Sequence, residues 1–305
     1  MFRQTNNAQQ QNKRLTFVSL ICSGIGQTEH RIPPHRQCFN VSRNSKIKIL
    51  RICIWCRQTE EKVSFKKVAH TIPQSLGGKN ICCNVCDSCN LVFGSHYQGS
   101  PSVETIIKET FNVSRMRFLN SNNQIGKNKK LPRFSSIYFD VNFNKRKIDL
   151  KLAFRLQAGF QEKICRQLKK GIYKIYLEEI ERQKGIGLDP QFDFIREFAR
   201  YNLGDYPVFY FQRSFGAIAI SNDWVSNPQF HLEGDYQMKY LVQEPGFFEF
   251  ELLGHVFGIT TSRSWEIALD NYLKKTGDQK KKYFKSIKSI TKLSDIDLLL
   301  SILDE

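Results

Sequence analysis

Two Cys-x-x-Cys pairs constrain the fold of this chain more than any other feature of its sequence. The first pair is Cys53 and Cys56, and the second is Cys86 and Cys89. Each pair can offer two thiolates to a tetrahedral metal ion, so one ion can close the loop between the pairs. Because four thiolates fill the coordination sphere of zinc and leave no position for water, the pattern predicts a structural zinc ion.

Cys82 and Cys83 offer an alternative within the second pair. Either could replace Cys86 as a ligand, but the two residues between Cys86 and Cys89 allow both of those sulfurs to reach one ion. The plainer interpretation of Cys82 and Cys83 is burial in a strand. The chain has nine cysteines, an odd number, and the spacing of the two pairs suits metal better than disulfides. We therefore expect a reducing, cytoplasmic setting.

The charge balance of the chain indicates a polyanionic partner. The 305 residues include 46 basic and 29 acidic side chains, which gives a formal net charge of +17. Clustered Lys and Arg side chains gain affinity by displacing counterions from a phosphate backbone, so DNA is the first expected partner, with RNA as an alternative. The sequence has no run of roughly 18 apolar residues, the length that a membrane-spanning helix needs, so no membrane partner is expected.

We predict an α+β chain in four parts. Residues 1–46 form a basic, poorly ordered N-terminal arm; residues 47–118 form a small zinc-stapled domain with a following helix; residues 119–133 form a linker. Residues 134–305 form a larger α+β domain of unknown type. The Asn-rich and basic composition of 119–133 marks the boundary between the two folded parts.

Hydrophobic patterning places elements within both folded parts. In the first, strands at 47–53, 61–69 and 80–85 and a brief helix at 87–93 give a β-β-helix order, and a second helix follows Ser100 and Pro101. In the second, we expect a strand at 137–143, a helix along the apolar arc from Phe160 to Ile175 and a helix capped by Asp189 and Pro190. Aromatic strands follow in 208–220 and 247–261, with bends at Gly216 and Gly254. A lysine-rich stretch at 274–292 and a tail helix from Ser294 end the chain.

His70 lies between the cysteine pairs and is followed by Pro73 and Gly77-Gly78. Hydrolysis of a phosphodiester requires a base with a near-neutral pKa, which histidine provides without perturbation. Asn90 can offer an amide oxygen to a hard cation such as Mg²⁺. Asn84 or Asn80 can orient the base. The alternative is a structural histidine beside the zinc.

These residues together resemble the HNH endonuclease family, in its cysteine-rich branch with a ββα-metal fold. The resemblance covers residues 51–95 and includes His70-x-Ile-Pro73-x-x-Leu-Gly-Gly78 and Cys-x-x-Cys-Asn90. It implies metal-dependent hydrolysis of DNA by one histidine and one divalent ion, Mg²⁺ or another, in addition to structural zinc. His70 would be the general base, and Asn90 would bind the divalent ion.

Ala69 departs from the family pattern, in which the residue before the base is commonly an acidic or histidine metal ligand. Glu60, Glu61 or Asp87 could complete the metal shell, phosphate and water could hold the ion, or the site could be degenerate. The alternative function is therefore a non-catalytic, zinc-dependent nucleic-acid-binding protein on the same scaffold.

Five lysines are the expected contacts to nucleic acid, and a solvated surface is the plainer interpretation of them. They are Lys66, Lys67, Lys79, Lys129 and Lys130. The other histidines share no ligand spacing, and His96 is the nearest rival to His70.

Overall fold

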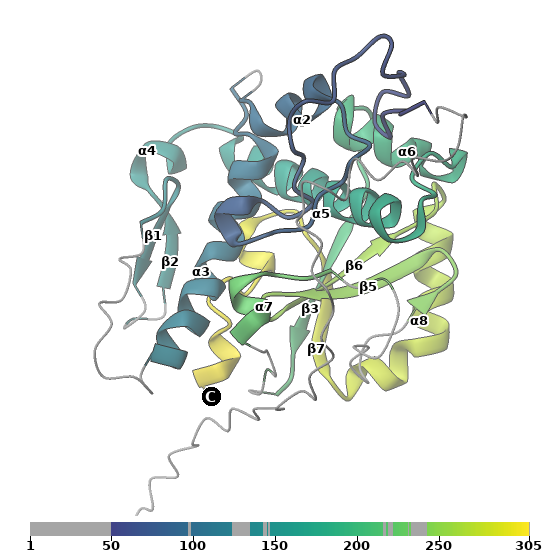
Figure 1. Cartoon of the computed structure of the whole chain (residues 1–305). Helices are drawn as coiled ribbons and strands as arrows, with labels where there is room; N and C mark the ends of the chain where they lie inside the picture. Colours follow the sequence, from purple (N-terminus) through teal and green to yellow (C-terminus); the bar gives the residue numbers. More distant parts are fainter. Residues whose placement is uncertain are drawn as a thin grey trace, which may run out of the picture.

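The computed structural model describes residues 50–96, 99–123, 135–142, 145, 147–215, 218, 222–230, 232 and 243–304. The described chain is a mixed α+β structure, as predicted (Figure 1). The predicted N-terminal arm lies outside this range, as do Lys129 and Lys130. Within the described ranges, none of the helices combines the length and the apolar content that a membrane crossing requires.

The cysteine-rich part of the chain contains short elements joined by tight turns. A 3-10 turn, η1, spans Gln74–Leu76, and helix α2 spans Asp87–Gly94. The predicted strands are reduced to two isolated antiparallel bridges, Ile52 with Thr59 and His70 with Ile81. The bridge between Ile52 and Thr59 does not extend into a longer strand pair, because the chain reverses direction between these residues. Arg57 N–H closes this turn by donating to the Cys53 carbonyl over 2.8 Å. The predicted helix at 87–93 is confirmed.

Helix α3, Val103–Asn123, and helix α5, Phe160–Lys184, are the two long helices. The apolar residues that predicted them are buried on both. The helices meet at Gly171, where a Cβ atom would lie 2.4 Å from Cγ1 of Ile107. Only glycine allows this approach. Helix α3 continues to Asn123, so its last turns occupy the start of the segment predicted as a linker.

The main sheet has five antiparallel strands in the order β4-β5-β6-β3-β7. The strands are β3 Val208–Arg213, β4 Gln243–Glu244, β5 Phe247–Leu252, β6 His255–Thr260 and β7 Phe284–Ser289. Leu253 and Gly254 join β5 to β6 with φ values of 49° and 85°, a two-residue turn with both angles positive. The bend predicted at Gly254 is confirmed, whereas Gly216 lies outside the described residues.

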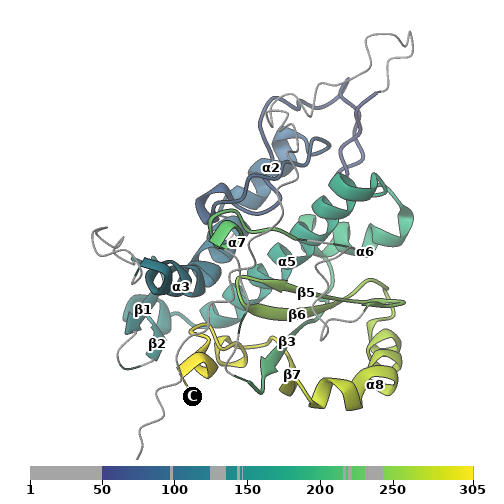
Figure 2. The same cartoon turned by 60° about the horizontal axis from the view of Figure 1, so that its bottom comes forward.

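Helix α8, Trp265–Lys281, and helix α5 cover opposite faces of this sheet (Figures 1 and 2). Side chains alternate along each strand, as the pleat requires. On β3, Val208 and Tyr210 join the large core with α5, while Phe209 and Phe211 join the smaller core with Tyr272 of α8. The sheet is therefore the middle layer of a three-layer arrangement.

The large core also contains the cysteine-rich part of the chain. Trp55, Leu76 and Phe93 belong to the same buried cluster as Ile172 and Tyr210. Figure 1 shows residues 50–94, in purple and blue, lying over α5. The candidate site thus packs against α5, which is buried along most of its length.

Shorter elements complete the fold. They are the hairpin β1 Phe139–Asn142 and β2 Lys147–Leu150, helices α4 Leu152–Arg155 and α7 Asn222–Ser226, and the consecutive turns η2 Pro190–Phe192, α6 Asp193–Ile195 and η3 Arg196–Arg200. The predicted cap is confirmed, because the Asp189 side chain accepts from Gln191 N–H over 2.9 Å.

The C-terminal end differs from the prediction. Instead of a tail helix from Ser294, it has two 3-10 turns, η4 Leu293–Asp295 and η5 Ser301–Asp304. Asp295 turns back to accept hydrogen bonds from Thr291 and Lys292, which closes a tight turn in place of a helical start. The lysine-rich stretch contains the end of α8 and strand β7.

Candidate active site and metal centre

The side chains of Cys53, Cys56, Cys86 and Cys89 converge on one point. Their sulfur atoms all lie within 4.8 Å of one another, and Cys56 Sγ is 3.7 Å from Cys86 Sγ. Zinc–sulfur bonds of about 2.3 Å place tetrahedral sulfurs about 3.8 Å apart, so the cluster fits a four-coordinate zinc ion. Cys86 belongs to this cluster, whereas Cys82 is buried outside it.

Hydrogen bonding between the thiols and burial shift their pKa values in opposite directions. A hydrogen bond from Cys89 lowers the pKa of Cys53 to about 5 against the effect of burial, whereas burial raises the pKa of Cys56 to about 11. Thiolates are the species that bind zinc, so zinc binding releases the protons that remain.

Hydrogen bonds from the surrounding chain orient the sulfurs. Cys86 N–H donates to Cys53 Sγ over 3.3 Å, and Ser88 Oγ lies 3.1 Å from Cys86 Sγ. Arg200 Nε donates to Cys89 Sγ over 3.3 Å from the end of η3. Such outer contacts fix ligand geometry, and the arginine also offsets the negative charge of four thiolates.

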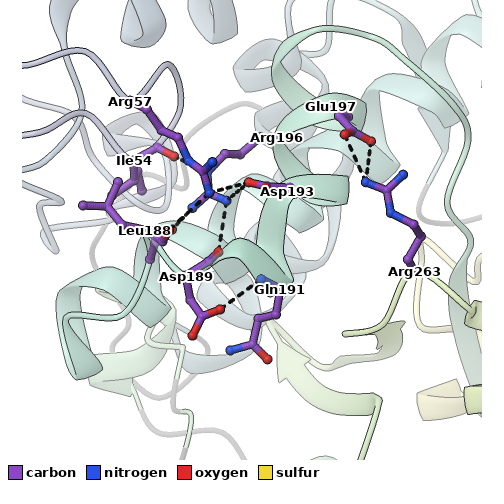
Figure 3. A network of polar contacts seen from close by, with 10 residues as sticks. Ile54, Arg57, Leu188, Asp189, Gln191, Asp193, Arg196, Glu197 and Arg263 are labelled. Atoms are coloured by element: carbon purple, nitrogen blue, oxygen red, sulfur yellow. Dashed lines mark hydrogen bonds and ion pairs between the residues drawn. The ribbon is translucent and has the colours of Figure 1, made fainter.

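A second set of contacts joins the loop around Cys53 and Cys56 to the turns that follow α5 (Figure 3). The buried Arg196 guanidinium donates to the carbonyls of Ile54, over 2.6 Å, and of Gly187. Arg57 pairs with Asp193 at 2.6 Å, and Arg196 shares that carboxylate at 2.7 Å. Residues far apart in sequence therefore hold the first cysteine pair in place.

His70 lies at the centre of its isolated bridge, half-buried. The bridge is flanked by two backbone hydrogen bonds, Cys82 N–H to the Ala69 carbonyl at 2.9 Å and Thr71 N–H to the Asn80 carbonyl at 3.0 Å. Burial, and then the Lys174 ammonium, lower the pKa of His70, while Glu104 opposes them. The imidazole is therefore neutral near pH 7 and able to accept a proton.

The loop after His70 depends on its two glycines. Gly77 has a φ of 91°, and a Cβ atom there would lie 2.1 Å from the Ser226 carbonyl oxygen. A Cβ atom on Gly78 would lie equally close to the Ile72 carbonyl oxygen. The loop can return beneath His70 only because both positions lack a side chain.

Asn90 connects helix α2 to the chain that leads into His70. Its Nδ2 donates to the Val68 carbonyl over 3.3 Å. That bond uses the amino end of the amide and leaves Oδ1 as a ligand atom of the kind that Mg²⁺ prefers. Ala69, between Val68 and His70, is only 1% exposed and has no ligand atom to offer.

The comparison with known families agrees with this arrangement. Residues 53–100 match the HNH endonuclease family. We refer to these residues as the HNH segment. No curated protein and no solved structure matches the chain. The HNH segment is thus a nuclease-like unit with a four-cysteine cluster suited to zinc.

Asn84 and Asn80, the two asparagines considered for orienting His70, bond to different partners. Asn84 Nδ2 donates to Glu181 Oε1 over 2.5 Å, at the end of α5. Asn80 Nδ2 donates to Gln229 Oε1 over 3.0 Å, and its carbonyl accepts from Thr71, the neighbour of His70. Asn80 therefore contacts the neighbour of His70 through its backbone, whereas Asn84 contacts α5, and an orienting role for either side chain stays a prediction.

Among the acids considered as metal donors, Asp87 is held by the backbone of the segment before His70. Its Oδ1 accepts from Lys67 N–H over 2.7 Å; burial opposes the ionised form, but this and neighbouring contacts lower its pKa. The charges that act on His70 are those of Lys174 and Glu104. Neither was identified from the sequence, because both lie on helices outside the motif and no spacing rule connects them to it.

The remaining predicted residues lie on the surface or outside the described chain. Lys66, Lys67, Lys79 and His96 are exposed. His255, by contrast, is fully buried in the second part of the chain, where burial lowers its pKa to about 3.

Proposed function

We propose that this protein is a metal-dependent HNH-type endonuclease that hydrolyses phosphodiester bonds in DNA, with His70 as the general base. One observation supports this most: the Asn90 amide bonds to Val68, two residues before a half-buried histidine whose pKa is lowered. A neutral imidazole and an amide oxygen are thereby brought to the same short stretch of backbone, which the HNH match independently marks as nuclease-like.

Each residue has a defined task in this proposal. His70 takes the proton from the attacking water. Lys174 donates from Nζ to the His70 carbonyl over 2.9 Å and so holds the backbone of the base. Asn90 Oδ1 would bind Mg²⁺ or another divalent cation, which when bound neutralises charge that develops on the phosphate. A zinc ion held by the four thiolates would have no open position and would only stabilise the fold.

Charge supports a nucleic-acid substrate. The net charge of +17 favours a polyanion, and Lys66, Lys67 and Lys79 of the HNH segment are exposed. We propose that these three lysines, together with Lys129 and Lys130, contact the phosphate backbone. The spacing of the two Cys-x-x-Cys pairs suits metal better than disulfides, which is typical of a reducing compartment, so we propose the cytoplasm.

Nicking of supercoiled plasmid DNA in Mg²⁺ or Mn²⁺ tests the proposal. The zinc-loaded protein is expected to convert supercoiled to open-circular DNA, and His70→Ala to reduce the rate by at least about 100-fold, as for loss of a general base. His96→Ala is the matched control, since His96 is an exposed histidine of the same segment. No nicking by the wild type, or equal nicking by His70→Ala, would contradict the proposal.

The second candidate function is zinc-dependent nucleic-acid binding without catalysis. It is favoured by Ala69, which is buried and offers no ligand where the family commonly has one. Tight DNA binding by the zinc-loaded protein, without nicking in either metal, would support it over the nuclease.

A further inference from the structure

Glu104 is the second residue of α3, just beyond the matched HNH segment. Its side chain is 33% exposed. The carboxylate lies against the last turn of α2, because a Cβ atom on Gly94 would be 3.7 Å from Glu104 Oε2. Gly94 follows Asn90 by four residues, so the two share one face of α2. Glu104 therefore lies along the face of α2 that carries Asn90.

Glu104 also lies close to His70. Lys174 Nζ is 3.8 Å from Glu104 Oε1 and 2.9 Å from the His70 carbonyl oxygen. The Glu104 carboxylate and the His70 carbonyl thus both lie beside the Lys174 ammonium. The charge of Glu104 acts on the imidazole as well, where it opposes the effects of burial and of Lys174 on the pKa of His70.

Glu104 is not needed to neutralise Lys174. Glu178 Oε2 accepts from Lys174 Nζ over 2.8 Å, and Trp55 Nε1 donates to the other oxygen of Glu178 over 3.1 Å. Both Lys174 and Glu178 are fully buried, whereas Glu104 reaches solvent. Burial raises the pKa of Glu178, and Lys174 opposes that effect. When Glu178 is ionised the buried pair is neutral, and the charge of Glu104 is an excess negative charge beside His70.

We propose that Glu104 supplies the carboxylate ligand of the catalytic divalent ion, in place of the ligand that Ala69 cannot provide. The proposal rests on the nuclease function proposed above. Its basis is that Glu104 lies along the face of α2 that carries Asn90 and shares Lys174 with the His70 carbonyl. Carboxylate and amide oxygens are hard donors that suit Mg²⁺ or Mn²⁺, and a partly exposed carboxylate can bind an ion that a phosphate oxygen also coordinates.

The test measures metal binding apart from activity. Mn²⁺ is titrated into zinc-loaded, full-length protein, and free Mn²⁺ is followed by electron paramagnetic resonance. Glu104→Gln is expected to weaken Mn²⁺ binding at least tenfold and to slow nicking, while Glu104→Asp retains part of both. Zinc content and the thermal unfolding midpoint show that each variant is folded.

The matched control is Glu266→Gln, because Glu266 is likewise the second residue of a helix, α8, and is exposed. It reports any effect of losing a first-turn carboxylate, and we expect it to bind Mn²⁺ as the wild type does. If Glu104→Gln binds Mn²⁺ and nicks DNA as the wild type does, the ligand proposal is overturned and the nuclease stands. If the wild type binds Mn²⁺ through Glu104 but cuts no DNA, the nuclease proposal fails and the ligand assignment stands. Absence of Mn²⁺ binding by the wild type overturns the ligand assignment.

Discussion

The guanidinium of Arg200 donates a hydrogen bond from Nε to the sulfur of Cys89, 3.3 Å away. Burial disfavours the charge on Arg200, yet the contact with Cys89 raises the pKa of Arg200 above its usual value. A zinc ion with four thiolates has a net negative charge, so a cation bonded to one sulfur stabilises it. The contact joins the end of η3 to the HNH segment.

Replacing Arg200 should weaken zinc binding. Arg200→Gln removes the charged donor to Cys89, and loss of such an outer contact typically costs about 10–100-fold in metal affinity. Competition with a chromogenic chelator measures the zinc dissociation constant. Arg263→Gln is the control, because Arg263 pairs with Glu197 on the surface, away from the cysteines. Equal zinc affinity of Arg200→Gln and wild type would show that the contact has no energetic role.

Removal of zinc should destabilise the whole fold. The cysteine cluster contributes to the same core as α5, so we expect one zinc ion per chain and a lower unfolding midpoint after treatment with a strong chelator. Cys86→Ser should lose the ion, while Cys82→Ser, outside the cluster, should keep it. Elemental analysis and circular dichroism provide the readouts. Full zinc content in Cys86→Ser would contradict the four-cysteine site.

Replacing one partner of the buried Lys174–Glu178 pair should lower the free energy of unfolding. Lys174→Met leaves Glu178 buried without its counter-ion, so Glu178 must take up a proton or stay charged, and removing one partner of a buried pair costs about 3–5 kcal/mol. Adding Glu178→Gln removes that charge but keeps an acceptor for the Trp55 indole, so at least half of the loss should be recovered. Urea unfolding at pH 8 measures both variants. If the double variant is as unstable as Lys174→Met, the unpaired charge is not the cause.

His255 should make the protein sensitive to acid. It lies in the core with its Nδ1 3.4 Å from Tyr210 Oη, and burial first and Arg213 second lower its pKa from 6.5 to about 3. The unfolded chain therefore binds a proton that the folded chain excludes, and stability present above about pH 6.5 declines as the pH falls toward 3.

The His255→Gln variant measures this effect. Between pH 7 and pH 5, the wild type should lose about 2 kcal/mol more unfolding free energy than the variant, given the two pKa values. His96→Gln, which replaces an exposed histidine, should follow the wild type. Parallel pH profiles for wild type and His255→Gln would show that His255 is protonated in the folded state.

Local patterns in the sequence predicted several parts of the molecule well. The cysteine spacing identifies all four members of the cluster, because two intervening residues are enough to direct both sulfurs to one point. The apolar stripes of α3 and α5 predict both helices, since those residues face the core. Gly77 adopts the positive φ that its place in the loop indicates.

Features that depend on distant partners were not predicted. The sequence marks 274–292 only as lysine-rich, yet Lys280 is buried and pairs with Glu249, a residue of β5. Nothing in the local sequence shows that such a charge is compensated. Glu104 was missed for a similar reason. Its relation to His70 arises from the packing of α3 against α2 and α5.

The close approach of α3 and α5 at Gly171 bears on how this protein can change during evolution. A methyl group at position 171 would overlap Ile107, so a larger residue on one helix demands a smaller one on the other. The HNH segment leads directly into α3 and packs on α5, so we do not expect it to be exchangeable as a self-contained unit. The HNH segment and its supporting helices are expected to co-vary, and a graft of the HNH segment alone should fail unless the Ile107–Gly171 contact is transferred with it.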